Sequence, residues 1–207
     1  DNVPLTTFIG LIFIIVGLLF KVAAAPFQAW APDVYQGSPT GYVGYMATVA
    51  KVSSFIVLAR LVAVSLTFII DQFDLFFSAV VILSVLAGAL FAANQNDLKR
   101  LIAYSGVIQS GFILSGISSG VYGISASTFY LITYIIQLIG IFTVFTIISG
   151  QLSSDFQISN ISGLFKENKF ITITFSIFML GLAGLPLTSG FVSKFILITN
   201  LLSLIHI

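Results

Sequence analysis

Three lysines, Lys21, Lys51 and Lys194, each lie inside a long apolar run of this sequence. A charged side chain near the centre of a lipid bilayer is unfavourable by a few kcal/mol or more. Removing an ammonium group from water disfavours its charged form, so a buried lysine can gain and lose a proton near neutral pH. Lysines at these positions therefore indicate proton transfer across a membrane rather than simple anchoring in lipid.

Hydroxyl, phenol and amide side chains accompany the lysines at helical spacing and could join them into a path. Two simpler explanations stay open. A lysine near a helix end can extend to the membrane surface, which explains at most one of the three. Stripes of small and polar residues also serve helix packing. The polar residues concerned are Thr48, Ser53, Ser54, Tyr104, Ser105, Gln109, Ser110, Tyr130, Tyr134, Gln137, Thr188, Ser189 and Ser193.

The composition is that of an all-α polytopic membrane protein. Of the 207 residues, 58% are hydrophobic and 7% are charged, whereas a soluble domain has about 25% charged residues. The mean hydropathy is +1.13, and several apolar stretches reach the length of about 20 residues that crosses a bilayer. The net charge of +1 provides no basic surface for nucleic acid, and the chain has no cysteine for disulfides, zinc or iron–sulfur clusters.

We expect six transmembrane helices, and the charges between them set their orientation. The loop lysines and arginines all lie in the third and fifth connections, while the second connection carries only Asp71 and Asp74. By the positive-inside rule, the first, third and fifth connections are cytoplasmic. The expected segments are residues 5–25, 42–69, 75–93, 98–118, 123–149 and 170–201.

Two of the six segments cannot be continuous helices. Pro26 interrupts the first, which we expect to continue as a short amphipathic piece ending near Trp30, and the run GLPLTSG from Gly184 interrupts the sixth. Proline lacks a backbone donor and clashes with the preceding turn, and non-helical backbone at membrane depth is tolerated only against protein or a wet cavity. Each break lies close to one of the lysines, as in transporters built from internal repeats. A kink that serves packing alone is the alternative.

The two ends of the sequence indicate a piece of a longer chain. There is no initiator methionine, and residues 1–4 predict a loop that enters a helix. Residues 202–207 are what a common transposase sequencing adapter encodes in frame, so we expect a non-native tail there, with a genuine helix end as the alternative. This tail holds the only histidine, His206, which we therefore exclude as a proton carrier.

Three stretches resemble the N-type antiporter-like, proton-translocating subunit of respiratory complex I, the NADH:quinone oxidoreductase. Residues 25–40, APFQAWAPDVYQGSPT, are similar to its PFHxWxPDVYxGxPxP signature. Residues 96–105, NDLKRLIAYS, are similar to its xIKRLLAYSS stretch, and residues 182–191, LAGLPLTSGF, with Lys194, to LAGxPxTxGFxxKF. The PDVY sequence is specific, because the L- and M-type paralogues and the sodium/proton antiporter relatives usually have PDA there.

The resemblance implies a fragment with six transmembrane helices of a fourteen-helix antiporter-like fold built around two inverted five-helix repeats. Residues 1–201 would be a partial proton-translocating domain, with first-repeat helices over about 5–69 and second-repeat helices over about 75–201. By position, Lys21 would be the central lysine of broken helix seven, Lys51 the lysine of helix eight, and Lys194 the lysine of broken helix twelve. The glutamate that pairs with the helix-seven lysine would lie upstream of this sequence.

The same alignment assigns supporting positions in the family motifs. Gln28 and Gly41 depart from the family pattern, and Gln28 replaces a histidine, which puts an entrance role at that position in doubt. The implied supporting residues are Pro26, Trp30, Asp33, Tyr35, Lys99, Pro186 and Gly190.

The function implied is proton translocation coupled to electron transfer from NADH to quinone in other subunits. NADH, FMN, iron–sulfur clusters and quinone would belong to those partners, and none would bind this chain. We expect the bacterial inner membrane, rather than an organellar one, and contacts with other membrane-arm subunits. The alternatives are a sodium/proton antiporter subunit and a structural membrane subunit that does not pump; a plastid-type or hydrogenase-linked relative also stays open.

Overall fold

The computed structural model describes residues 4–66, 70–149, 156–161 and 163–205. These residues form helices and no strand, apart from one isolated bridge between Asp97 and Gln157. One long helix covers residues 40–65, and two of its segments, Met46–Ala50 and Leu61–Ser65, are π-helical. The α-helices are α1 (Leu5–Lys21), α2 (Trp30–Gly37), α3 (Thr40–Tyr45), α4 (Lys51–Arg60), α5 (Ile70–Ala93), α6 (Leu98–Ser118), α7 (Gly120–Ser149), α8 (Leu164–Glu167), α9 (Lys169–Ala183) and α10 (Ser189–Ile205).

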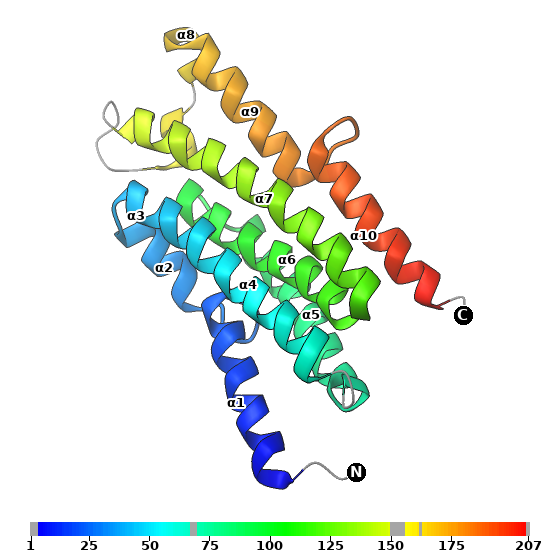
Figure 1. The fold of residues 1–207 in the computed structure, drawn as a ribbon. Helices are drawn as coiled ribbons and strands as arrows, with labels where there is room; N and C mark the ends of the chain where they lie inside the picture. Colours follow the sequence, from blue (N-terminus) through cyan, green and yellow to red (C-terminus); the bar gives the residue numbers. More distant parts are fainter. Residues whose placement is uncertain (1–3, 67–69, 150–155, 162, 206–207) are drawn as a thin grey trace.

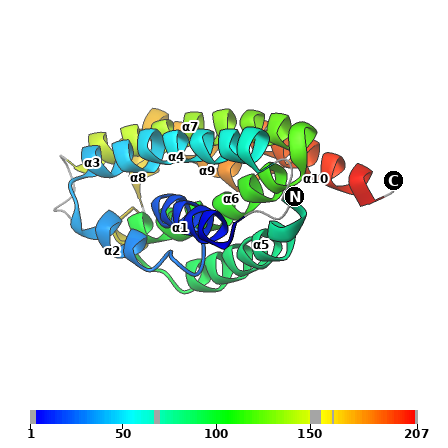
Figure 2. The same ribbon diagram turned by 60° about the horizontal axis from the view of Figure 1, so that its bottom comes forward.

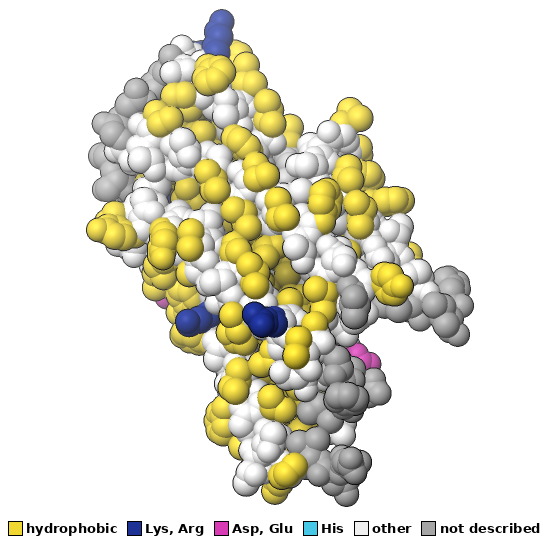
Figure 3. Space-filling model, in the orientation of Figure 1, with side chains coloured by type: hydrophobic (Ala, Val, Ile, Leu, Met, Phe, Trp, Pro, Cys, Tyr) yellow, Lys and Arg dark blue, Asp and Glu magenta, His cyan; other side chains and the backbone are white. Residues whose placement is uncertain are grey.

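Four helices of the described residues are long and apolar enough to cross a membrane: Thr40–Ser65, Gln72–Ala93, Leu98–Ser118 and Tyr122–Ser149. They confirm the four middle segments expected from the sequence. The first and last segments are interrupted, as the prolines and glycines predict, and contain the shorter apolar helices α1, α9 and α10. The face of the molecule in Figure 3 is accordingly apolar over most of its area, with basic side chains at a few separate places.

The expected course of the first segment was wrong in its boundaries. We expected a helix to residue 25 and an amphipathic piece ending near Trp30, but α1 ends at Lys21 and α2 begins at Trp30. Ala23 has a φ of +56°, outside the right-handed helical region, and a residue before proline disfavours that region as well. The chain therefore leaves the helix several residues before Pro26. Asp33, expected in a loop, lies in the first turn of α2.

Helix α6 lies at the centre of the arrangement (Figures 1 and 2), packed against α5 on one side and α7 on the other. It also contacts α2 and α10. Its sequence suits this position, because glycines and serines, such as Gly106 and Ser110, let neighbouring helices come close. Helix α1 extends away from the other helices towards the N-terminus (Figure 1).

The first, third and fifth connections meet at one end of the bundle. The Arg100 guanidinium forms an ion pair with Asp33 at 2.6 Å, and Lys99 Nζ donates to the carbonyl oxygen of Ser38 at 3.0 Å and lies 4.7 Å from the centre of the Phe156 ring. Asp74 lies elsewhere, in a pocket with serines from the end of α6. The expectation that these three connections share one side is confirmed, while the assignment of that side to the cytoplasm stays a prediction.

Candidate functional site

Lys51 lies inside the bundle, on the long helix formed by residues 40–65. Its side chain is 3% exposed, and its Nζ atom donates to the carbonyl oxygen of Gly106 on α6 at 3.0 Å. The same ammonium group lies 5.8 Å from the centre of the Tyr134 ring on α7. Among the described residues, its ammonium group thus contacts a carbonyl and an aromatic ring rather than a carboxylate.

Gly106 makes this contact possible. A Cβ atom at this position would lie 2.9 Å from Lys51 Nζ and 3.0 Å from the Tyr134 hydroxyl, so a side chain would displace both groups. The hydroxyl of Ser110, one turn further along α6, lies 2.8 Å from the Gly106 carbonyl oxygen and 2.8 Å from that of Val22. Ser110 therefore connects the surroundings of Lys51 with the residue that follows Lys21.

The first break comprises residues 22–29, between α1 and α2. Lys21 is the last residue of α1 and is exposed, at a helix C-terminus, where a positive charge is favoured. The backbone groups of the break are bound by other helices: the N–H of Ala25 donates to Ser84 Oγ at 2.9 Å, and Trp30 Nε1 donates to the carbonyl oxygen of Phe20 at 3.0 Å. These contacts fix the break without using the lysine.

The second break lies between Ala183, the end of α9, and Ser189, the start of α10. Gly184 adopts a φ of +81°, and a Cβ atom there would lie 2.9 Å from the Lys194 side chain. Lys194 Nζ donates to the carbonyl oxygens of Ala183 at 3.0 Å and Leu182 at 3.3 Å. Lys194 thus occupies the C-terminal end of α9, where free carbonyls favour a positive charge.

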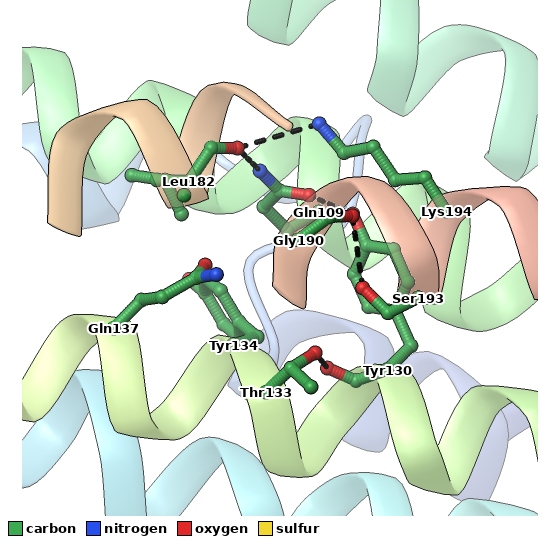
Figure 4. A pocket seen from close by; sticks show the side chains of 10 residues that line it. Gln109, Tyr130, Thr133, Tyr134, Gln137, Leu182, Gly190, Ser193 and Lys194 are labelled. Atoms are coloured by element: carbon green, nitrogen blue, oxygen red, sulfur yellow. Dashed lines mark hydrogen bonds between the residues drawn. The ribbon is translucent and has the colours of Figure 1, made fainter. Parts of the chain in front are cut away.

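A polar cavity lies beside Lys194 (Figure 4), and Tyr134, whose ring faces Lys51, is one of its lining residues. The space between its lining atoms is about 160 Å³, part of it open to the outside, and none of it is wide enough for a water molecule. One hydrogen-bonded chain crosses its wall: the Tyr130 hydroxyl donates to Gln109 Oε1, and Gln109 Nε2 donates to the Leu182 carbonyl at 3.0 Å. That carbonyl also accepts from Lys194. The lining residues are Gln109, Tyr130, Thr133, Tyr134, Gln137, Gly181, Leu182, Gly190, Ser193 and Lys194.

The structure brings some of the expected site residues together and separates others. Lys51 lies against Tyr134 of α7, which also lines the cavity beside Lys194, whereas Lys21 approaches Lys51 only through the backbone beside it. The remaining expected residues fall into three places. Pro26 and Trp30 lie at the first break, Pro186 and Gly190 at the second, and Asp33, Tyr35 and Lys99 near the end where the three connections meet.

Tyr35 and Lys99 are more enclosed than their place near connecting segments would indicate. Tyr35 is 4% exposed and packs edge-on against Phe142 of α7, and burial raises the pKa of its phenol. Lys99 is 5% exposed. Both therefore help to hold α2 and the start of α6 against the rest of the bundle.

Some residues of the site were missed in the sequence. Gly106 and Ser84 carry no chemistry that a motif would mark, and Gly106 matters because it lacks a side chain. The Leu182 carbonyl acts through the backbone, which a sequence pattern does not show. The one available signal was the spacing of Gly106 and Ser110, two small residues one turn apart beside Gln109 in the polar stripe of α6.

The chain matches known proteins over almost its whole length. Residues 2–207 match the family described as NADH:quinone oxidoreductase/Mrp antiporter, TM. The NADH-quinone oxidoreductase subunit N of Mycobacterium tuberculosis is 43% identical over 191 residues, which are 90% of this chain and 36% of that protein. The chain thus spans about a third of the length of the curated relatives it matches.

Solved structures show the same arrangement of helices. A chain of respiratory complex I from Thermus thermophilus with bound aureothin is 35% identical, with a TM-score of 0.77 over 91% of this chain and 41% of that one. A chain of the Mrp complex from Dietzia sp. is 26% identical, with a TM-score of 0.82 over 92% of this chain and 35% of that one. On these grounds, the chain belongs to the NADH:quinone oxidoreductase/Mrp antiporter membrane family.

Proposed function

We propose that this chain is part of an N-type subunit of NADH:quinone oxidoreductase that moves protons across the membrane. The 43% identity to a subunit N over most of the chain supports this assignment. The observation that carries it is the position of Lys51, a buried lysine whose contacts among the described residues include no carboxylate and whose neighbour Tyr134 lines the cavity beside Lys194. A lysine so placed can exchange a proton, whereas a purely structural subunit gains nothing from burying it.

The path we propose runs from Lys21 through Lys51 to Lys194. Protons enter from the cytoplasm and reach Lys21 at the first break. Ser110, which lies 2.8 Å from both the Val22 and the Gly106 carbonyl oxygens, provides the hydroxyl between the first break and Lys51. Beyond Lys51, Tyr134 and the groups of the cavity lead to Lys194 at the second break.

The energy for this transport comes from partner subunits in our proposal. Electron transfer from NADH to quinone would take place there, on FMN and iron–sulfur clusters held by those subunits. Other membrane-arm subunits and lipid would surround this chain, in the inner membrane of a bacterium. The absence of cysteine in this sequence supports placing cysteine-ligated iron–sulfur clusters in the partners.

A sodium/proton antiporter subunit is the second candidate, and the similarity to the Mrp complex favours it. Both candidates use the same fold, so the fold does not separate them. The higher identity to the complex I chain and the PDVY sequence of residues 32–35 favour the first. Dependence of proton movement on sodium would favour the antiporter.

The test uses the full-length subunit in membrane vesicles, with NADH-driven proton uptake as the measurement. Lys51→Ala and Lys194→Ala should each lower uptake in a complex that still assembles, because each removes a proton-carrying group. Lys166→Ala, at an exposed lysine of α8, is the matched control and should leave uptake unchanged. Normal uptake in both the Lys51 and the Lys194 variant would contradict the proposal, and loss of sodium/proton exchange instead would establish the second candidate.

A further inference from the structure

Gln137 of α7 is buried in the bundle with its amide nitrogen unpaired. Gln137 is 5% exposed, and among the described residues no group accepts a hydrogen bond from its Nε2 atom. Leaving a buried donor unsatisfied costs about 1–3 kcal/mol, so such a group in a folded protein needs an explanation. Figure 4 shows the amide turned towards the polar cavity.

The amide of Gln137 lies against two glycines of the second break. Its Nε2 atom is 3.0 Å from the position that a Cβ atom would take at Gly181 and 3.0 Å from that at Gly190. A Cβ atom at Gly190 would lie only 1.8 Å from the Gly181 carbonyl oxygen, so the last turn of α9 and the first turn of α10 touch through their backbones here. Gln137 is thus positioned where the two halves of the broken helix meet.

Three other polar side chains of the cavity are held in place by hydrogen bonds. Gln109 binds the Leu182 carbonyl, Tyr130 binds Gln109, and Lys194 binds the carbonyls at the end of α9. Moving any of them breaks a hydrogen bond. The amide nitrogen of Gln137 has none to break, and a glutamine side chain is long enough to move its amide by rotation about its single bonds.

We propose that Gln137 is the gate between Lys51 and Lys194, and that its amide nitrogen binds a water molecule when the gate is open. This inference rests on the proposed function. In the arrangement seen here the cavity is too narrow for water, so no water joins Tyr134, beside Lys51, to the Lys194 end. Movement of the Gln137 amide makes room for one water, which accepts its N–H and bonds to neighbouring hydroxyls. A buried water with several polar partners is stable, and it can pass a proton across the cavity.

The first test is Gln137→Met in the full-length subunit within the assembled complex. Methionine has a similar length and flexibility but no amide. We expect NADH-driven proton uptake to fall to the level of Lys194→Ala and the solvent deuterium isotope effect on uptake to rise, because proton transfer across the cavity becomes rate-limiting. A residue with a purely structural role would not change the isotope effect. Ile136→Leu, at the exposed neighbouring position, is the matched control and should resemble wild type.

Gly181→Ala provides a second variant in case Gln137→Met prevents assembly. It keeps every polar group, but its methyl group would meet the Gln137 amide at 3.0 Å and restrict its movement. We expect lower uptake and a larger isotope effect here as well. A high-resolution structure of the assembled complex should also show a water within hydrogen-bond distance of Gln137 Nε2.

The possible results distinguish a failure of the gate proposal from a failure of the proposed proton path. If Lys194→Ala lowers uptake while Gln137→Met and Gly181→Ala keep wild-type uptake and isotope effect, the gate is wrong and the proposed function stands. If Lys194→Ala leaves uptake intact, the proposed function fails first. Loss of uptake in the Gln137 or Gly181 variant with a raised isotope effect supports the gate.

Discussion

The two helix breaks differ in which groups bind the backbone that each one frees. At the first break, side chains from elsewhere do so: Ser84 accepts from the Ala25 N–H, and Trp30 donates to the Phe20 carbonyl. At the second break, the free carbonyls of Leu182 and Ala183 accept from Lys194 itself. The lysine is therefore part of the structure of the second break but not of the first.

This difference indicates which of the two lysines is bound by groups of the described residues. Lys194 finds its partners within the described residues, whereas Lys21 is exposed at the end of α1. The chain spans about a third of the length of its curated relatives, so in a longer chain other residues could cover Lys21. We expect substitutions near the second break to act locally, and the surroundings of Lys21 to depend on segments outside this sequence.

The largest effect is expected for Lys51, because it lies between the two breaks. Lys51→Met keeps an unbranched buried side chain but removes the group that exchanges a proton, and loss of such a group slows transfer by about 10²-fold or more. The measurement is proton uptake by the full-length subunit in vesicles. Lys51→Arg is the informative companion, because arginine stays protonated and should be equally inactive. A wild-type rate of proton uptake in either variant would show that protons pass between the two breaks without Lys51.

A smaller effect on transport, with a measurable effect on stability, is expected for Gly106→Ala. The added methyl group would lie 2.9 Å from Lys51 Nζ and 3.0 Å from the Tyr134 hydroxyl, and overpacking of this kind costs about 1–3 kcal/mol. Thermal unfolding of the assembled complex and its NADH-driven proton uptake in membrane vesicles measure the two consequences. Gly41→Ala is the matched control, since nothing lies within 4 Å of a Cβ atom there. Equal behaviour of the two variants would refute the role given to Gly106.

The two breaks should respond differently to loss of a single hydroxyl. Ser84→Ala leaves the buried N–H of Ala25 unpaired and should cost about 1–3 kcal/mol of stability. At the second break the Thr188 hydroxyl accepts from the Phe191 N–H at 3.3 Å and donates to the Leu185 carbonyl oxygen at 2.6 Å, both in exposed positions. Because water can replace both contacts, the expected cost of Thr188→Ala is about 0.5 kcal/mol. Thermal unfolding of both variants checks the order, and a larger loss for Thr188→Ala would reverse the comparison.

The smallest effect is expected where the three connections meet. The Arg100 and Asp33 side chains are 26% and 72% exposed, so their ion pair should contribute no more than about 1 kcal/mol. Asp33→Asn should lower the unfolding temperature slightly in low salt and hardly at all in high salt, because salt screens exposed charges. Asp74→Asn, an exposed aspartate away from this cluster, is the control. A loss that is independent of salt would show a structural role beyond the ion pair.

Much of the fold was predictable because hydropathy and proline act locally. The four middle helices, the two interruptions and the meeting of the first, third and fifth connections all followed from apolar length, Pro26, Pro186 and the placement of charges. The boundary at Lys21 was not predictable, since the chain turns at Ala23, a residue with no preference for such a conformation. That turn is stabilised by partners distant in sequence, among them Ser110.

The sequence by itself determined that the chain crosses a membrane and that Lys21, Lys51 and Lys194 lie inside apolar runs, because the composition of a segment decides whether it enters lipid. It also determined that the first and the last segments are interrupted, though not the residue at which the first helix ends. Only the tertiary structure decided that Lys51 faces Gly106 and Tyr134, and that Gln137 lies unpaired against the second break. These contacts depend on which face of each helix meets its neighbour, and that is set by the packing of the whole bundle.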